Sequence, residues 1–230
     1  MNMIDVLRDA GADIALRYDH TIIIKPKELS KHLSGTVIGD YIVSGTLTII
    51  GALTAKDYID IHDARIEDLS AFLTSIEKMG AKFEKRDNDT LRVYRSKKLK
   101  ATNIQTNIYP GFPTDMQAQF MALATQANGT STIDERLFEN RFMHVSELLR
   151  MGADIQLNGN IATIIGEKGK LSGTDVMATD LRASSALVLA ALVAQGETNI
   201  HRIYHLDRGY EDLEGKFLKI GANIQRCKEK

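Results

Sequence analysis

The sequence predicts an α/β fold of pseudo-threefold repeats, each of about 70 residues, with helices buried inside and sheets outside. Two observations lead to this prediction. The Gly-Ala pairs that begin at Gly11, Gly80, Gly152 and Gly221 follow similar apolar segments, so one supersecondary unit recurs along the 230 residues. In addition, one helix of each unit is apolar nearly all round, which is typical of a helix buried on every side.

The second repeat shows the elements of the unit most clearly. Apolar residues from Leu69 to Met79 recur at helical spacing and predict an amphipathic helix that Gly80 ends. Alternating segments at 81–84 and 91–94 flank a polar turn and predict a β-hairpin. Further elements are expected in the order strand, helix and strand, at 103–108, 117–127 and 130–134.

The other repeats follow the same order. After Gly152 we expect a strand, a turn at 158–160 and a strand at 161–165. The apolar helix of this unit is expected at 183–194, with weaker copies at 47–53 and 120–124. Nearer the start, the segments 21–24 and 32–37 are expected to be extended.

Composition excludes several function classes. The net charge of −1 gives no basic surface for nucleic acid, and no apolar stretch is long enough to span a membrane. Cys227 is the only cysteine, so neither an internal disulfide framework nor a cysteine-based metal site is possible. The absence of a secretory signal and the single thiol fit a reducing, cytoplasmic location.

Charged residues stand at the predicted helix starts. Thr114 and Gln117 have the spacing of a capping box, and Asp115 lies where the helix dipole favours a carboxylate. Asp115 is therefore either a simple helix-start acid or a functional residue. Asp180 and Arg182 are two residues apart and do not share a helix face, and Arg182 at a positive helix end requires a nearby anion.

Two further segments are candidates. At the 204–211 corner, Asp207 could cap a helix, and Arg208 beside Gly209 either grips a carboxylate or phosphate or belongs to a solvated turn. The 137–144 connection contains an arginine and His144, which we expect on a helix surface. His201 and His205 are expected on one face of a strand, and no metal site is expected.

Four motifs in order, at 112–120, 138–145, 177–184 and 202–211, closely resemble the C-terminal part of the enolpyruvyl transferases that act on UDP-N-acetylglucosamine. The resemblance covers the whole chain and is weaker before Tyr109. It implies the inside-out α/β barrel of that family. It also implies transfer of the enolpyruvyl group of phosphoenolpyruvate to the sugar 3-hydroxyl with release of phosphate, which begins peptidoglycan precursor synthesis.

The resemblance also implies roles for individual residues. Asp115 matches the aspartate that contacts the 3-hydroxyl and serves as general base, and Leu137 matches a backbone contact to the sugar nucleotide. Asp180 and Arg182 match the pair that lines the reaction centre. Arg208 matches an arginine on the phosphoenolpyruvate side, and Arg141 matches an arginine that lines the site. No cofactor is expected.

Family members are about twice as long as this chain and have two such domains. The resemblance identifies residues 1–38 as the last piece of the first domain and 39–230 as the second domain. The Lys-Asn pair and the acid loop of the first domain have no counterpart here, and Cys227 does not match that loop. We therefore expect a missing N-terminal half to complete the enzyme and its C-terminal sheet. The alternatives are a non-catalytic binding or regulatory module, or a shikimate-phosphate enolpyruvyl transferase.

Overall fold

The structure is a computed structural model that describes residues 2–19, 21–30 and 35–227. The chain divides into two compact units, Met1–Gly39 and Asp40–Lys230. In the first unit, helix α1 (Asn2–Asp9) precedes an antiparallel pair of strands, β1 (Asp13–Leu16) and β2 (Ile22–Lys25). Within the segment expected to be extended at 32–37, residues 32–34 lie outside the described part, and no strand is assigned to residues 35–37.

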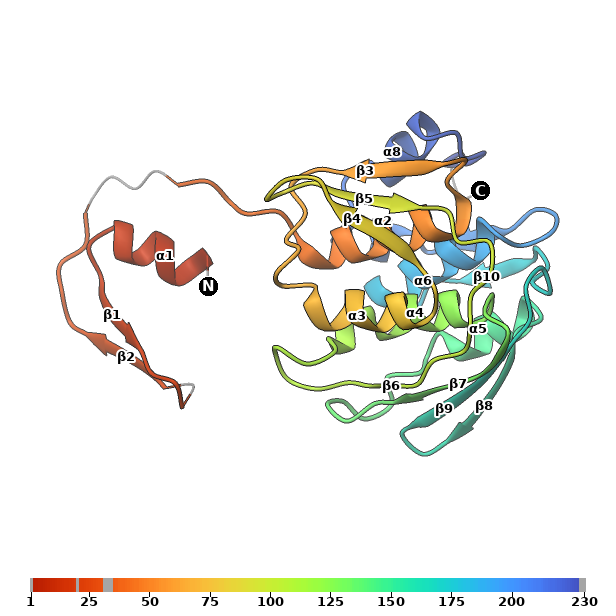
Figure 1. Ribbon diagram of the computed structural model, residues 1–230, viewed down its shortest axis with the longest axis horizontal. Helices are drawn as coiled ribbons and strands as arrows, with labels where there is room; N and C mark the ends of the chain where they lie inside the picture. Colours follow the sequence, from red (N-terminus) through yellow and green to blue (C-terminus); the bar gives the residue numbers. More distant parts are fainter. Residues whose placement is uncertain (1, 20, 31–34, 228–230) are drawn as a thin grey trace. The chain divides into compact units, whose positions relative to one another are not determined.

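The second unit combines helices with three sheets (Figure 1). Its helices are α2 (Tyr41–Thr54), α3 (Ser70–Lys78), the 3₁₀ turn η1 (Thr114–Met116), α4 (Gln117–Ala124), α5 (Val145–Arg150), α6 (Leu181–Ala191), α7 (Tyr204–Asp207) and α8 (Leu213–Lys219). Its strands are β3 (Tyr58–Ile61), β4 (Lys82–Lys85), β5 (Leu91–Tyr94), β6 (Ile104–Gln105), β7 (Gly129–Asp134), β8 (Asp154–Asn158), β9 (Ile161–Gly166), β10 (Asp175–Met177) and β11 (Asn199–His201). The sheet orders are β3-β5-β4, β6-β7-β9-β8 and β10-β11.

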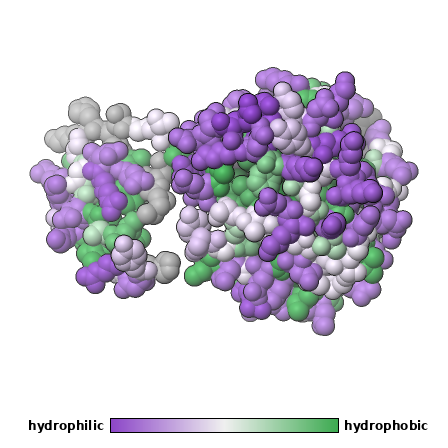
Figure 2. Space-filling view, in the orientation of Figure 1, coloured by the Kyte–Doolittle hydropathy of each residue, from purple (hydrophilic) through white to green (hydrophobic). Residues whose placement is uncertain are grey.

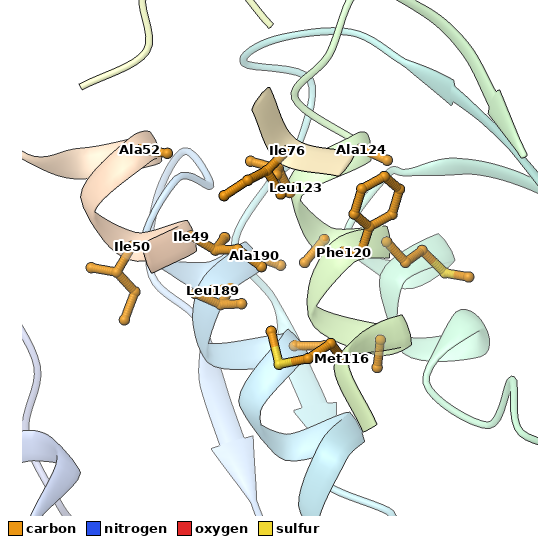
Figure 3. Packing of buried hydrophobic residues seen from close by; sticks show 14 of the residues in the cluster. Ile49, Ile50, Ala52, Ile76, Met116, Phe120, Leu123, Ala124, Leu189 and Ala190 are labelled. Carbon is orange, nitrogen blue, oxygen red and sulfur yellow. The ribbon is translucent and has the colours of Figure 1, made fainter. Parts of the chain in front are cut away.

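Helices α2, α4 and α6 form the centre of the second unit, as the apolar pattern predicts. All eight residues of α4 are buried, and so is one continuous run of eight residues in α6. Figure 3 shows Ile49 of α2, Phe120 of α4 and Leu189 of α6 within one packed core. Threonines inside α2 are tolerated because their hydroxyls donate to carbonyls one turn back, as Thr48 does to Ser44 at 2.8 Å.

The recurring glycines end four helices in the same way. Gly11, Gly80, Gly152 and Gly221 follow α1, α3, α5 and α8, and each has φ between 90° and 97°. After each glycine, the alanine N–H donates to a carbonyl five residues back, at 2.9–3.0 Å. This left-handed ending favours glycine because other side chains would clash there. The helix end predicted at Gly80 is confirmed.

The hairpins β4–β5 and β8–β9 are also confirmed, but the strand expected at 103–108 is not. Only Ile104–Gln105 pairs as β6, because the chain then turns back and the Asn107 N–H donates to the Phe112 carbonyl at 3.0 Å. The described strands form separate sheets, so no closed barrel is present among them. Residues 222–227 carry no strand.

The described helices include none long and apolar enough to cross a membrane. Figure 2 shows charged and polar residues over much of the visible face of the second unit. On the N-terminal unit, apolar residues gather on the visible face. Ile22 and Ile24 of β2 are 53% and 67% exposed.

Candidate functional site

The first turns of α2, α4 and α6 meet at one end of the helical core. A Cβ added at Gly45 in α2 would lie 2.7 Å from the Met116 side chain just before α4, so these two helix starts are in close contact. The Tyr41 phenol, at the first position of α2, lies within electrostatic range of both Asp115 and Arg182. Burial raises the pKa of Tyr41, and the nearby carboxylates of Asp115 and Asp40 raise it further.

Asp115 lies in η1 and binds two arginines from distant parts of the chain. Arg141 Nη2 donates to Asp115 Oδ1, and Arg182 Nη2 donates to Asp115 Oδ2 at 3.0 Å. The Asp115 side chain is 38% exposed, so a ligand can reach it. Because one carboxylate faces two guanidiniums, the three side chains together carry a net charge of +1. Such a cluster can bind an anion while it holds the carboxylate in place.

Asp180 and Arg182 do different things at the start of α6. Asp180 Oδ1 accepts hydrogen bonds from the backbone N–H groups of Arg182 and Ala183, at 2.7 and 2.9 Å, and so caps the helix. The Arg182 guanidinium does not pair with Asp180 and binds Asp115. The anion that an arginine at a positive helix end requires is therefore supplied by another segment of the same chain.

The capping box predicted for Thr114 and Gln117 is wrong. No side chain caps α4, because η1 precedes it and the Thr114 hydroxyl donates to Glu135 Oε2 at 2.8 Å. Asp115 is likewise not a cap, since its carboxylate is taken by the two arginines. Of the two interpretations left open for Asp115, the structure is against the simple helix-start acid.

The connection from β7 to α5 brings Leu137 and Arg141 to the same place. The Leu137 N–H donates to Glu135 Oε1 at 2.9 Å, and no described residue donates to the Leu137 carbonyl. The Phe138 ring lies under the Arg141 guanidinium, 4.7 Å from ring centroid to Cζ. This stacking fixes the arginine beside Asp115.

Arg208 directly follows α7, and its guanidinium is exposed, with no hydrogen bond or ion pair to the described residues. Its corner packs on the start of α6, because a Cβ added at Gly209 would lie 3.0 Å from Leu181. A larger residue at position 209 would therefore have to displace the Leu181 side chain slightly. On the other side, the buried Tyr210 hydroxyl lies 2.8 Å from Thr46 Oγ1 of α2.

Asp207 does not cap a helix as predicted. It ends α7 and binds Arg226 through two bonds of 2.7 and 3.0 Å, because the C-terminal segment returns to this corner. The guanidinium of Arg226 lowers the pKa of Asp207. The helix that follows is capped by Asp212, whose side chain accepts from the Gly215 N–H at 3.2 Å.

The histidine predictions need correction. His144 was expected on a helix surface, but it is 2% exposed, and burial lowers its pKa to about 4. His201 and His205 do not share a strand, since His201 ends β11 and His205 lies in α7. Among the residues that the structure describes, no group of three His, Cys, Asp or Glu side chains could hold a metal ion.

Sequence reasoning missed Tyr41 and Glu135. An aspartate stands immediately before both α2 and α6, at Asp40 and Asp180, and Tyr41 is the first residue of α2. This shared pattern is a signal that could have pointed to Tyr41. Glu135 follows Ser131 and Ile133 at a spacing of two, and all three are buried. An acid in phase with the buried positions of a strand is the signal for a charge inside the protein.

Two hollows of the second unit lie away from the predicted site residues. A hollow of about 550 Å³ lies over β4 and the end of α3, where Gly80 and Phe83 line it, and none of the predicted site residues belongs to it. Another, of about 310 Å³, lies at the opposite ends of the three central helices and is lined by Thr54, Gln126 and Val193. Neither hollow includes the charged side chains that converge at the starts of the central helices.

Comparisons with known proteins identify the family of the chain. The family described as EPSP synthase (3-phosphoshikimate 1-carboxyvinyltransferase) matches residues 1–217. A UDP-N-acetylglucosamine 1-carboxyvinyltransferase from Aliarcobacter butzleri is 65% identical over 84% of this chain and 45% of its own length. Another, from Campylobacter lari, is 54% identical over 100% of this chain and 54% of its own.

Solved structures place the fold in the same group. The enolpyruvyl transferase NikO from Streptomyces tendae has a TM-score of 0.88 at 31% identity and covers 97% of this chain and 53% of its own. An EPSP synthase from Acinetobacter baumannii has a TM-score of 0.58 at 20% identity, with 72% and 40% covered. The chain spans about half the length of the curated relatives it matches.

Proposed function

The chain belongs to the enolpyruvyl transferase family typified by EPSP synthase, and from this membership we propose that it provides half of an active site for enolpyruvyl transfer. The reaction moves the enolpyruvyl group of phosphoenolpyruvate to the 3-hydroxyl of UDP-N-acetylglucosamine and releases phosphate. This is the first committed step of peptidoglycan precursor synthesis. Support for these substrates comes from relatives that carry this name at 54–65% identity.

The observation that carries the proposal is the Asp115 carboxylate, exposed and held between two guanidiniums at the end of the helical core. Addition of the sugar hydroxyl to the enol carbon needs a base for the hydroxyl proton and an acid for the methylene carbon. Asp115 is the base in this proposal. The second oxygen of Asp180, which accepts no bond from the described residues, lines the reaction centre beside it.

The arginines bind the anionic substrate. Phosphoenolpyruvate carries a carboxylate and a phosphate, so several guanidiniums must converge on it. Arg208 is exposed and makes no bond within the described residues, and it therefore binds the phosphoenolpyruvate side. Arg182 and Arg141 hold Asp115 and line the site, while the Leu137 carbonyl accepts a hydrogen bond from the sugar nucleotide.

Further protein completes the enzyme in this proposal. We assign residues 1–38 to the end of a first domain and 39–230 to a second domain, an inside-out α/β barrel of three repeats. The missing N-terminal half would supply the acid for the methylene carbon. Two observations support this: the relatives are about twice as long, and Ile22 and Ile24 are exposed on the N-terminal unit.

Two other functions remain as outcomes of the test. A non-catalytic binding module is favoured by the coverage of only half of each relative. A shikimate-phosphate enolpyruvyl transferase is favoured by the description of the matching family, whereas the solved EPSP synthase structures, at 20% identity, support only the fold. The exposed, arginine-bound Asp115 argues against the first, because a module without catalysis has no evident need for this cluster.

Phosphate release tests the proposal. The chain is assayed alone and after mixing with the N-terminal portion of the A. butzleri relative, with UDP-N-acetylglucosamine or shikimate 3-phosphate as acceptor. We expect activity only in the mixture and only with the sugar nucleotide. Asp115→Asn should lower kcat about 10²- to 10⁴-fold, the usual range for a general base. The exposed control Glu167→Gln should leave kcat unchanged, and silence of a folded mixture would refute the proposal.

A further inference from the structure

Glu135 is a buried carboxylate that forms no ion pair with an arginine or lysine of the described residues. It follows β7, continues the inward alternation of that strand and is 2% exposed. Among the described residues, no cation forms an ion pair with it. A buried charge is stable only if its oxygens accept enough hydrogen bonds, so the partners of this carboxylate show what it does.

Four neutral donors surround Glu135. Its Oε1 accepts from the Thr106 hydroxyl and the Leu137 N–H, both at 2.9 Å, and from the Phe138 N–H at 3.2 Å. Its Oε2 accepts from the Thr114 hydroxyl at 2.8 Å. The donors come from three separate segments, which follow β6, begin η1 and follow β7.

These donors lead directly to the proposed site residues. Thr114 precedes Asp115 in η1, and Leu137 is the proposed backbone contact. Phe138 stacks on Arg141, and Arg141 returns to Asp115 through its ion pair. Asp115 and Arg141, the two members of this ion pair, are therefore both connected to Glu135 through short stretches of backbone.

We propose that Glu135 is a positioning residue for the transfer reaction. It fixes the turn that carries Asp115 against the connection that carries Leu137 and Arg141. It lies beneath the site and acts only through these residues. We call Glu135 and its four donors the clamp. The inference deepens the proposed function and rests on it for the identity of the substrates, whereas the clamp itself is a property of this chain alone.

The chemistry of the side chain separates charge from shape. In Glu135→Gln, the amide oxygen can keep the three donors of Oε1, while the new N–H₂ group faces the Thr114 hydroxyl. That hydroxyl can rotate and accept, so the variant keeps its shape but loses the charge. Glu135→Ala removes every acceptor and leaves the Leu137 and Phe138 amides without a partner.

Residue-resolved amide hydrogen exchange tests the clamp without any substrate. In the wild-type chain, the Leu137 and Phe138 amides should be protected. In Glu135→Ala they should exchange about tenfold faster or more, while the β9 amide of Ala162 keeps its rate. The control Glu139→Gln removes an exposed carboxylate of the same connection and should change neither. Unchanged protection in folded Glu135→Ala would overturn the inference. A neutral amide oxygen accepts more weakly than a carboxylate, so the two amides should also exchange faster in Glu135→Gln, by a smaller factor. This variant provides the measurement if Glu135→Ala fails to fold, and unchanged protection in it would then overturn the inference.

Kinetics in the mixture of halves then test positioning. Glu135→Gln should lower kcat and raise KM for UDP-N-acetylglucosamine, reducing kcat/KM about tenfold or more, with KM for phosphoenolpyruvate unchanged. In the double variant Glu135→Gln with Thr114→Val, the two reductions in kcat/KM should be less than multiplicative, because both act through one hydrogen bond. Multiplicative effects, or equal changes in both KM values, would overturn the inference. If the wild-type mixture is silent, the proposed function fails, and the exchange rates still decide the clamp.

Discussion

The buried His144 imidazole should make the stability of the chain fall as the pH drops from 7 to 5. Burial lowers its pKa to about 4 from the ordinary 6.5, with a smaller opposing effect from Asp180 and a smaller lowering by Arg141. Between pH 6.5 and about pH 4, the unfolded chain binds more protons than the folded chain. The free energy of unfolding therefore falls as the pH falls through this window. The full stabilising contribution of the neutral imidazole is present above pH 6.5.

The magnitude follows from the two pKa values. Each unit of difference is worth about 1.4 kcal/mol, so a drop from 6.5 to about 4 gives about 3 kcal/mol over the whole window. Integration over the part between pH 7 and pH 5 alone gives about 2 kcal/mol. This interval lies above the ordinary range of carboxyl groups, so their titration contributes little there.

Urea unfolding at pH 7 and pH 5, followed by circular dichroism, measures this difference. His144→Leu should reduce the fall by about 2 kcal/mol, whatever its effect on stability at pH 7. Leu148→Ala removes apolar contacts from the buried face of α5, the helix that directly follows His144. It should destabilise the chain at both pH values without changing the fall. An unaltered fall in His144→Leu would refute the assignment of the pH dependence to this imidazole.

Two further predictions follow from the arginine contacts. Arg182→Gln should lower kcat in the mixed assay at least tenfold, because Asp115 loses the 3.0 Å bond. The circular dichroism spectrum should stay unchanged, since the helix cap does not involve the guanidinium. A wild-type kcat would contradict this prediction. Arg226→Gln should lower the free energy of unfolding by only about 1 kcal/mol, because its pairs with Asp207 and Glu214 are both partly exposed. This loss should shrink in 1 M salt, and a salt-independent loss would contradict its electrostatic origin.

The sequence predicted those features that depend on neighbouring residues. An apolar stripe followed by Gly80 specifies a helix and its end within one segment, and the structure has both. The apolar segments around Ile49, Phe120 and Leu189 likewise specify burial by themselves. Each of these signals is local, so no knowledge of distant contacts was needed.

The predicted caps failed because distant groups compete for the same side chains. Thr114 and Asp207 have the spacing expected of caps, but Glu135 binds the first and Arg226 binds the second. These partners lie 21 and 19 residues away in the chain. Spacing cannot show such competition. For the same reason, spacing alone could not show that Asp115 binds two distant arginines.

The aspartates at the starts of the three central helices are held in different ways. Asp40 and Asp180 stand before α2 and α6, and each accepts two backbone N–H groups through one oxygen. Both carboxylates are thus held by the backbone of their own helix. Asp115 stands before α4 and binds the side chains of two arginines, and neither of these bonds is part of a helix cap. Of the three aspartates, Asp115 is therefore the one whose hydrogen bonds can be exchanged for those of a ligand without the loss of a helix cap.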